Sequence, residues 1–171
     1  MYNLNGKVAI ITGSGGKNGI GRSVANRLSK EGAKIVVTDI VENPYPEDGW
    51  NGLKSVTEEI ETNGGEALHI LSDVTDSSSI NKLIEKVIKK FNRVDILVNN
   101  AGAPANKDRV PIVDLSEDEW DRVLGINLKG VFLFSKAFSK QLILQNEGGK
   151  IINISSIAGK KGSATFGAYN A

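Results

Sequence analysis

The stretch TGSGGKNGIG, residues 12–21, separates the first predicted strand from the first predicted helix. Glycines at such a place let the backbone turn sharply and approach a pyrophosphate closely. The N–H groups of the next helix and the positive end of its dipole then bind the phosphates. A glycine cluster elsewhere would indicate only a flexible turn, but the order strand, glycine loop, helix predicts a dinucleotide site.

An acidic residue strengthens this prediction. Asp39 ends the second apolar run and follows Gly21 by 18 residues. A carboxylate there accepts hydrogen bonds from the adenosine ribose hydroxyls and repels a 2′-phosphate, which favours NAD over NADP. Lys17 and Arg22 point the other way, because either cation could contact a phosphate, so NADP stays open.

Five apolar runs are predicted to be strands, and helical patterns separate them. The runs are nearly continuous in Ile, Val and Leu, as in parallel strands that are buried on both faces. They are KVAIIT (7–12), KIVVTD (34–39), EALHIL (66–71), VDILVN (94–99) and GKIINIS (149–155). Strand alternating with helix predicts a doubly wound parallel sheet with helices on both faces.

Two helices have clear boundaries in the sequence. Apolar residues recur on one face of Ser77–Phe91, which Asp76 or Ser77 can cap, and Ser116 with Glu119 forms a capping box. Residues 126–144 are apolar on more than one face, which predicts packing on the sheet and against a second subunit, as a dimer or tetramer. Residues 41–53, VENPYPEDGWNGL, are predicted to form a surface loop.

The bulk composition is that of one globular domain over residues 1–171, with 40% apolar and 24% charged residues. The net charge of +1 gives no basic footprint for nucleic acid, and no apolar run is long enough for a membrane. The sequence has no cysteine, and its single histidine, His69, is predicted to be structural, so we expect no metal site. Since the N-terminus lacks a signal-peptide pattern, we expect a cytoplasmic protein.

Further motifs, taken together and in order, resemble the short-chain dehydrogenase/reductase superfamily in its single-domain branch. The glycine loop is similar to the Thr-Gly-x-x-x-Gly-x-Gly motif, with two extra residues before Gly19. The other matches are DV (73–74), NNAG (99–102), INLKG (126–130) and the pair Ser156 and Tyr169. The resemblance implies a Rossmann-type fold whose NAD(P) site contains Gly13, Ser14, Asn18, Gly19, Ile20, Gly21, Asp39, Asp73, Val74, Asn100, Ala101 and Gly102.

The same resemblance implies hydride transfer between a nicotinamide and a secondary alcohol or ketone. Tyr169 would be the general acid/base, Ser156 would bind the substrate oxygen, and Asn127 would hold a water that relays the proton. Ser155 offers the same chemistry as its neighbour, so the choice of Ser156 depends on its spacing of 13 residues from Tyr169. The structural alternatives are a serine bonded to local backbone and a half-buried packing tyrosine.

The family pattern extends past this sequence. Its catalytic Lys would lie two residues beyond Ala171, and the last two strands of its order 3-2-1-4-5-6-7 would follow. We therefore expect a longer molecule in the cell, and an exposed apolar edge at the strand near Ile151. Two alternatives to a general alcohol dehydrogenase remain open: a 3-oxoacyl thioester reductase, and a non-catalytic protein that only binds NAD.

Overall fold

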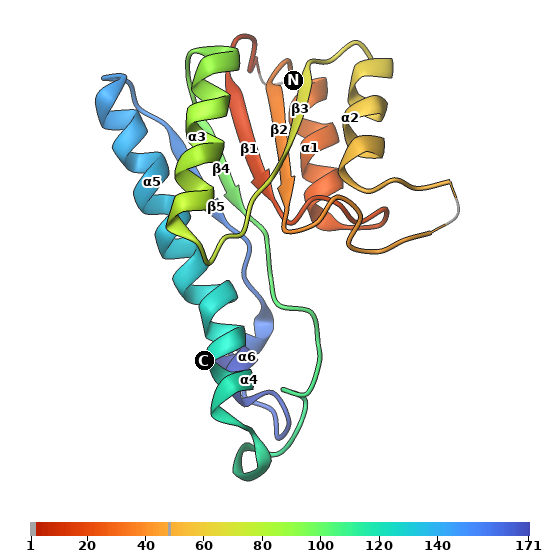
Figure 1. The fold of residues 1–171 in the computed structure, drawn as a ribbon, viewed down its shortest axis with the longest axis vertical. Helices are drawn as coiled ribbons and strands as arrows, with labels where there is room; N and C mark the ends of the chain where they lie inside the picture. The colour runs from red at the N-terminus through yellow and green to blue at the C-terminus, as the bar shows by residue number, and fades with distance from the viewer. Residues whose placement is uncertain (1–2, 48) are drawn as a thin grey trace.

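The computed structural model describes residues 3–47 and 49–171 (Figure 1). Five parallel strands form one sheet in the order β3-β2-β1-β4-β5, which agrees with the predicted doubly wound topology. All five predicted strands are present, and each boundary lies within two residues of its prediction. The strands are β1 (Val8–Thr12), β2 (Lys34–Asp39), β3 (Ala67–Leu71), β4 (Ile96–Asn99) and β5 (Lys150–Asn153).

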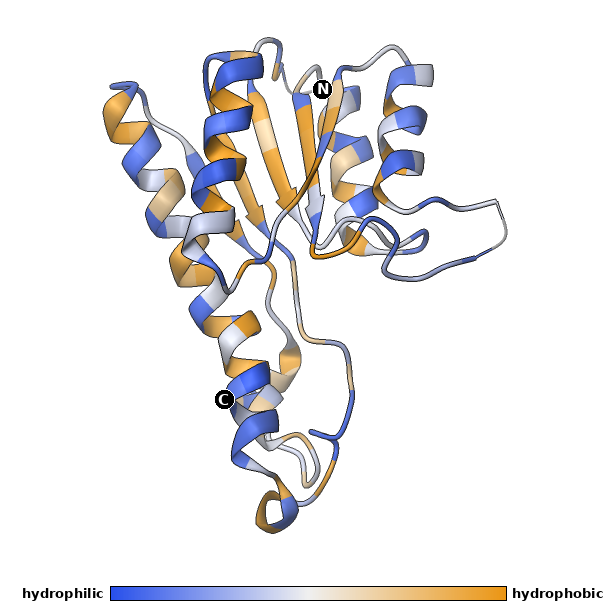
Figure 2. Cartoon of the chain, viewed as in Figure 1, coloured by the Kyte–Doolittle hydropathy of each residue, from blue (hydrophilic) through white to orange (hydrophobic). Residues whose placement is uncertain are grey.

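Helices cover both faces of this sheet, and each face has its own apolar core. One core joins α1 (Ile20–Lys30) and α2 (Leu53–Thr62) to the sheet, and the other joins α3 (Ser77–Phe91) and α5 (Val131–Leu144) to it. Successive residues of β1 alternate between the two cores, as the pleat requires: Val8 lies in one and Ala9 in the other. The middle parts of the central strands are accordingly hydrophobic (Figure 2).

The two predicted helix starts have the expected caps. The Asp76 side chain accepts hydrogen bonds from the backbone N–H groups of Ser78 (2.8 Å) and Ser79 (3.2 Å), and α3 begins and ends at the predicted residues. Ser116 Oγ accepts from the N–H of Glu119 at 3.3 Å, which opens α4 (Glu117–Leu124). The Glu119 carboxylate pairs with Arg122, so half of the predicted capping box is formed.

A long helical rod carries the chain past the carboxyl ends of the strands. It consists of α4, the π-helical turn η2 (Gly125–Gly130) and α5, and Figure 1 shows the three as one continuous helix. The short helices η1 (Ile112–Asp114), η3 (Ile157–Gly159) and α6 (Gly167–Asn170) complete the fold, and α6 packs on α4 and η3. No helix in the described ranges has both the length and the apolar character needed to cross a membrane.

Strand β5 is an exposed edge, as the sequence predicts. Within the described residues it pairs with β4 alone, and all four of its residues are exposed. Ile151 and Ile152 are 38% and 45% exposed, whereas the isoleucines of β1 are fully buried. The apolar character of β5 therefore fits a strand that another layer or another chain covers.

Candidate functional site

A cleft of about 940 Å³ opens at the carboxyl ends of β1, β2 and β4. The strand order reverses beside β1, since β2 and β4 flank it, and ligands of open parallel sheets bind at such switch points. Nine of the residues predicted to form the site line the cleft. They are Gly13, Gly19, Asp39, Asp73, Val74, Asn100, Ala101, Gly102 and Tyr169.

Two glycines of the loop after β1 are required by close contacts. Gly13 has a φ of +65°, and a Cβ placed on it would lie 2.7 Å from Ala101 Cα. A Cβ on Gly21 would lie 2.6 Å from the carbonyl oxygen of Gly13 and 2.9 Å from Asn100 Nδ2. Glycine at both positions therefore allows the start of α1 to pack directly against the turn that faces the cleft.

We expect Gly21→Ala to lower the free energy of unfolding by about 2 kcal/mol, because the added methyl group would push against backbone atoms that cannot move away cheaply. Gly148→Ala is the matched control, because a Cβ there meets no heavy atom within 4 Å. Urea unfolding of both variants checks the prediction, and equal stabilities for the two would contradict it.

The segment after β4 holds the glycine loop in place. Asn100 Nδ2 donates to the carbonyl oxygens of Thr12 (2.8 Å) and Gly13 (2.9 Å). The backbone N–H groups of Asn100 and Ala101 both donate to Thr12 Oγ1, at 3.0 and 2.9 Å. Thr12 begins the glycine motif quoted above but was not among the predicted site residues, although a hydroxyl residue directly before the first glycine was a usable signal. These bonds join β1 to β4 across the floor of the cleft.

Four predicted cofactor residues lie outside the cleft lining: Gly21, which packs against the turn as described above, and Ser14, Asn18 and Ile20. Ser14 is fully buried: its hydroxyl donates to the carbonyl of Ile11 at 2.8 Å, and its N–H donates to the carbonyl of Thr38 at 3.2 Å. Ser14 therefore fixes the shape of the loop. Asn18 and Ile20 are exposed beside the start of α1, and their role in cofactor binding stays a prediction.

Asp39 connects the end of β2 to the glycine loop. Its Oδ2 accepts from the N–H of Gly15 at 3.0 Å, and its Oδ1 accepts from the N–H of Ile40 at 2.9 Å. Burial raises the pKa of Asp39 above its ordinary value, while the two N–H groups act in the opposite direction. The carboxylate is thus held in one place at the cleft wall, where it can still accept further hydrogen bonds.

The two cations that left NADP open are both engaged with carboxylates. Lys17 Nζ lies 3.5 Å from Glu47 Oε2. Arg22 forms a bidentate pair with Glu59, at 2.8 and 2.9 Å, and donates to the carbonyl of Lys17 at 2.6 Å. Recruiting either cation to a 2′-phosphate would therefore mean breaking an existing ion pair.

The three predicted catalytic residues come from three separate elements. Tyr169 lies in α6, is half-buried and lines the cleft. Ser156 caps η3, and its Oγ accepts from the N–H of Ala158 at 3.1 Å. Asn127 lies in η2, and its Oδ1 accepts from the N–H of Ala103 at 2.8 Å. Ser156 and Asn127 lie outside the cleft lining, although α6 and η3 pack together.

A cation that the sequence analysis missed lies against Tyr169. The guanidinium carbon of Arg109 is 4.9 Å from the centre of the Tyr169 ring and 3.9 Å from that of Phe166. The buried Asp108 pairs with Arg109 at 3.3 Å and with Arg122 at 3.1 Å. These contacts join the loop after β4 to α6, and no local sequence pattern marks a contact between such distant segments.

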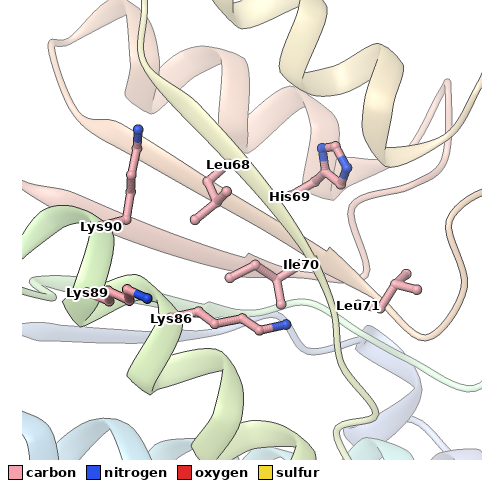
Figure 3. A pocket seen from close by; sticks show the side chains of 7 residues that line it. All are labelled: Leu68, His69, Ile70, Leu71, Lys86, Lys89 and Lys90. Carbon is pink, nitrogen blue, oxygen red and sulfur yellow. The ribbon is translucent and has the colours of Figure 1, made fainter.

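A second hollow, of about 570 Å³, lies along the outer side of β3 and holds no predicted site residue. Figure 3 shows Leu68 and Ile70 facing the α3 side of β3 and His69 turned toward the α2 side. His69 Nδ1 is 3.4 Å from Thr57 Oγ1, which fits the predicted structural role. The lysines of this hollow belong to the polar face of α3.

Comparison with known proteins identifies a matching family model and similar sequences. Residues 7–171 match the family model described as short chain dehydrogenase, in agreement with the resemblance seen in the sequence. The 2-dehydro-3-deoxy-D-gluconate 5-dehydrogenase of Dickeya dadantii is 38% identical over 99% of this chain. The 3-oxoacyl-[acyl-carrier-protein] reductase of Synechocystis is 37% identical over all of it.

Solved structures agree with these matches. The NAD+-bound xylitol dehydrogenase has a TM-score of 0.85 and 36% identity over 97% of this chain. A metagenomic short-chain oxidoreductase in complex with NADP has a TM-score of 0.83 and the same identity and coverage. The chain spans 61% and 64% of the two relatives, and 59% and 69% of the two solved chains.

Proposed function

The chain belongs to the short chain dehydrogenase family, and from this premise we propose that it binds NAD and carries residues for the interconversion of a secondary alcohol and a ketone. The observation that supports the proposal most is that glycines of the loop after β1, Asp39 and Tyr169 line one and the same cleft. The residues present fit a dinucleotide: Gly13 and Gly19 line the cleft next to the start of α1, where a pyrophosphate would bind, and Asp39 is an acceptor for ribose hydroxyls.

Bound nicotinamide would supply the hydride acceptor, and the protein would orient the alcohol and move its proton. In our proposal the phenolate form of Tyr169 accepts the proton from the alcohol oxygen and becomes the neutral phenol. The Ser156 hydroxyl accepts a bond from Ala158 and so keeps its own proton to donate to the substrate oxygen. The carbonyl oxygen of the Asn127 side chain is held by Ala103, which leaves its amide group to orient the relaying water.

The proposed substrate class is a small alcohol or ketone. The relatives include a sugar-acid dehydrogenase and a xylitol dehydrogenase, which support a polyol-like secondary alcohol. The 3-oxoacyl reductase relative supports a 3-oxoacyl thioester as the second candidate. A homo-oligomer and a cytoplasmic location remain predictions from the sequence, the first of them supported by Leu128 and Phe132, which are 62% and 59% exposed on the helical rod.

The test is to measure NADH binding and NADH formation with one panel of secondary alcohols. The panel should contain polyols, hydroxylated sugar acids and a 3-hydroxyacyl thioester. NADH binding together with oxidation of a panel member supports the proposal and identifies the class. Binding without oxidation of any member would support the alternative of a non-catalytic NAD-binding protein. Absence of NADH binding would refute both the dehydrogenase and the non-catalytic NAD-binding protein.

We expect Asp39→Asn to reduce the preference for NADH over NADPH by at least about tenfold, because the change removes a charge that would repel a 2′-phosphate. The ratio of the two dissociation constants measures the effect. Asp118→Asn is the control for net charge, since Asp118 lies in the first turn of α4, outside the cleft. An unchanged ratio in Asp39→Asn would show that another group discriminates between the cofactors.

A further inference from the structure

The segment between β2 and α2, residues 40–47 and 49–52, packs on the glycine loop; we call it the insert. Asp48, within the predicted surface loop, lies outside the described residues. Trp50 departs from that prediction, because its side chain is only 8% exposed and its indole Nε1 donates to the carbonyl oxygen of Gly15 at 2.8 Å. Arg22 lies 5.2 Å from the centre of the same ring. The indole therefore anchors the insert to the loop.

Close contacts continue along the loop. A Cβ on Gly15 would lie 2.5 Å from Pro44 Cδ, and one on Gly16 would lie 3.4 Å from Tyr45 Cδ2. The Lys17–Glu47 pair adds a third contact between loop and insert. Two glycines of the loop are thus in contact with the insert, and Lys17 belongs to the lengthened part of the loop.

The insert also places apolar side chains in the cleft. Ile40, Val41 and Tyr45 are 61%, 47% and 55% exposed, and all three line the cleft together with Pro44. Apolar side chains that gather in a cleft are typical of a surface that a ligand covers. The Asp39 carboxylate lies next to them in the chain and in the same cleft. A suitable ligand therefore combines hydroxyl donors with a flat apolar surface.

We propose that Val41, Pro44 and Tyr45 form a wall for the adenosine half of the cofactor, with the Tyr45 ring as its main contact. The inference rests on the proposed function, because it assigns these residues to NAD. Adenosine has the required chemistry: its ribose hydroxyls match Asp39, and its base is flat and aromatic. The anchor at Trp50 fixes the wall before the ligand arrives, so less conformational freedom is lost on binding.

The test compares the dissociation constants of NADH, ADP-ribose and nicotinamide mononucleotide for Tyr45→Ala and Tyr45→Phe. We expect Tyr45→Ala to weaken NADH and ADP-ribose about fivefold each, as for loss of one aromatic contact. Nicotinamide mononucleotide should bind as it does to the unmodified protein. Tyr45→Phe should retain full affinity, since the ring and not the hydroxyl makes the contact. Asn51→Ala is the control, because Asn51 is exposed in the insert and lies outside the cleft lining.

Trp50→Phe tests the anchor. It keeps most of the apolar ring but removes the N–H that donates to Gly15, so NADH should bind about threefold more weakly than to the unmodified protein. In the double variant with Tyr45→Ala, the loss of NADH binding free energy should be smaller than the sum of the two single losses, because the wall can contribute only when it is anchored. Full additivity would overturn the role of the anchor.

The outcomes distinguish a failure of the proposed wall from a failure of the proposed function. If the unmodified protein binds neither NADH nor ADP-ribose, the proposed function itself has failed. If the protein binds both and Tyr45→Ala changes neither constant by more than about twofold, the wall alone is refuted. An equal loss in Asn51→Ala would also refute it, because the effect would then come from a general disturbance of the insert.

Discussion

Replacing Tyr169 with Phe should lower the rate of alcohol oxidation by about a thousandfold, while the NADH dissociation constant stays within about twofold of its original value. The change removes the only group that our proposal lets accept the substrate proton. It keeps the ring that lies against the Arg109 guanidinium, so the fold of α6 should survive. Initial rates at saturating cofactor measure the effect in the protein as the cell produces it.

Serine variants make the same experiment sharper. Ser156→Ala should also reduce the rate, whereas Ser155→Ala should leave it unchanged if the spacing to Tyr169 selects the right serine. Retention of full rate by Tyr169→Phe would show that a different group moves the proton. A loss in Ser155→Ala but not in Ser156→Ala would transfer the substrate contact to the neighbouring hydroxyl.

The second large expected effect is on stability and concerns Asp95, at the end of the sheet opposite the cleft. Asp95 is 4% exposed and accepts hydrogen bonds from Lys7 Nζ (3.1 Å), the N–H of Val8 (2.9 Å) and Arg93 Nε (2.8 Å). We expect Asp95→Asn to lower the free energy of unfolding by about 3 kcal/mol, because two cations would lose their shared counter-charge. Glu147→Gln, at the exposed outer partner of Arg93, should cost less than about 0.5 kcal/mol.

The effect of Asp95 should depend on pH in one direction. Burial disfavours its charge, but the bonds from Arg93, Val8 and Lys7 outweigh burial and lower the pKa of Asp95. Its contribution is therefore present above the unfolded pKa, near about 4, and is lost as the pH falls through the lower native value. Urea unfolding at about pH 6 and about pH 3 should show the gap between wild type and Asp95→Asn narrowing at acid pH. A constant gap would contradict this account.

The sheet could be read from the sequence because its signal is local. Runs such as KIVVTD are apolar at nearly every residue, and only strands buried on both faces need that pattern. The start of α3 was equally accessible, since Asp76 caps it through neighbouring N–H groups. The π-helical turn was not predicted: Asn127 was assigned a role only through the family resemblance, and its partner Ala103 comes from a distant loop.

The sequence predicted the cleft residues that are glycines of a turn or that end a strand. Gly13 and Asp39 are examples, and both line the cleft. Contacts between distant segments were not predictable: Trp50 reaches Gly15 across 35 residues of sequence, and Arg109 reaches Tyr169 from a loop of mixed composition. Nothing in the local pattern of either segment names its partner. Ser14 shows the converse, because a residue inside a binding motif can be wholly engaged in shaping the loop.

The π-helical turn η2 also changes the phase of the helical rod. Each residue of an α-helix advances the side-chain direction by about 100°, so a turn widened by one residue rotates everything after it by that angle relative to a regular helix. Phe134 and Phe138 are buried on α5, after the rotation, while Val123 is buried on α4, before it. The rod can thereby direct buried side chains toward two different neighbouring parts of the fold, which a regular helix of the same sequence could not do. Asn127 lies in the π-helical turn where this rotation occurs.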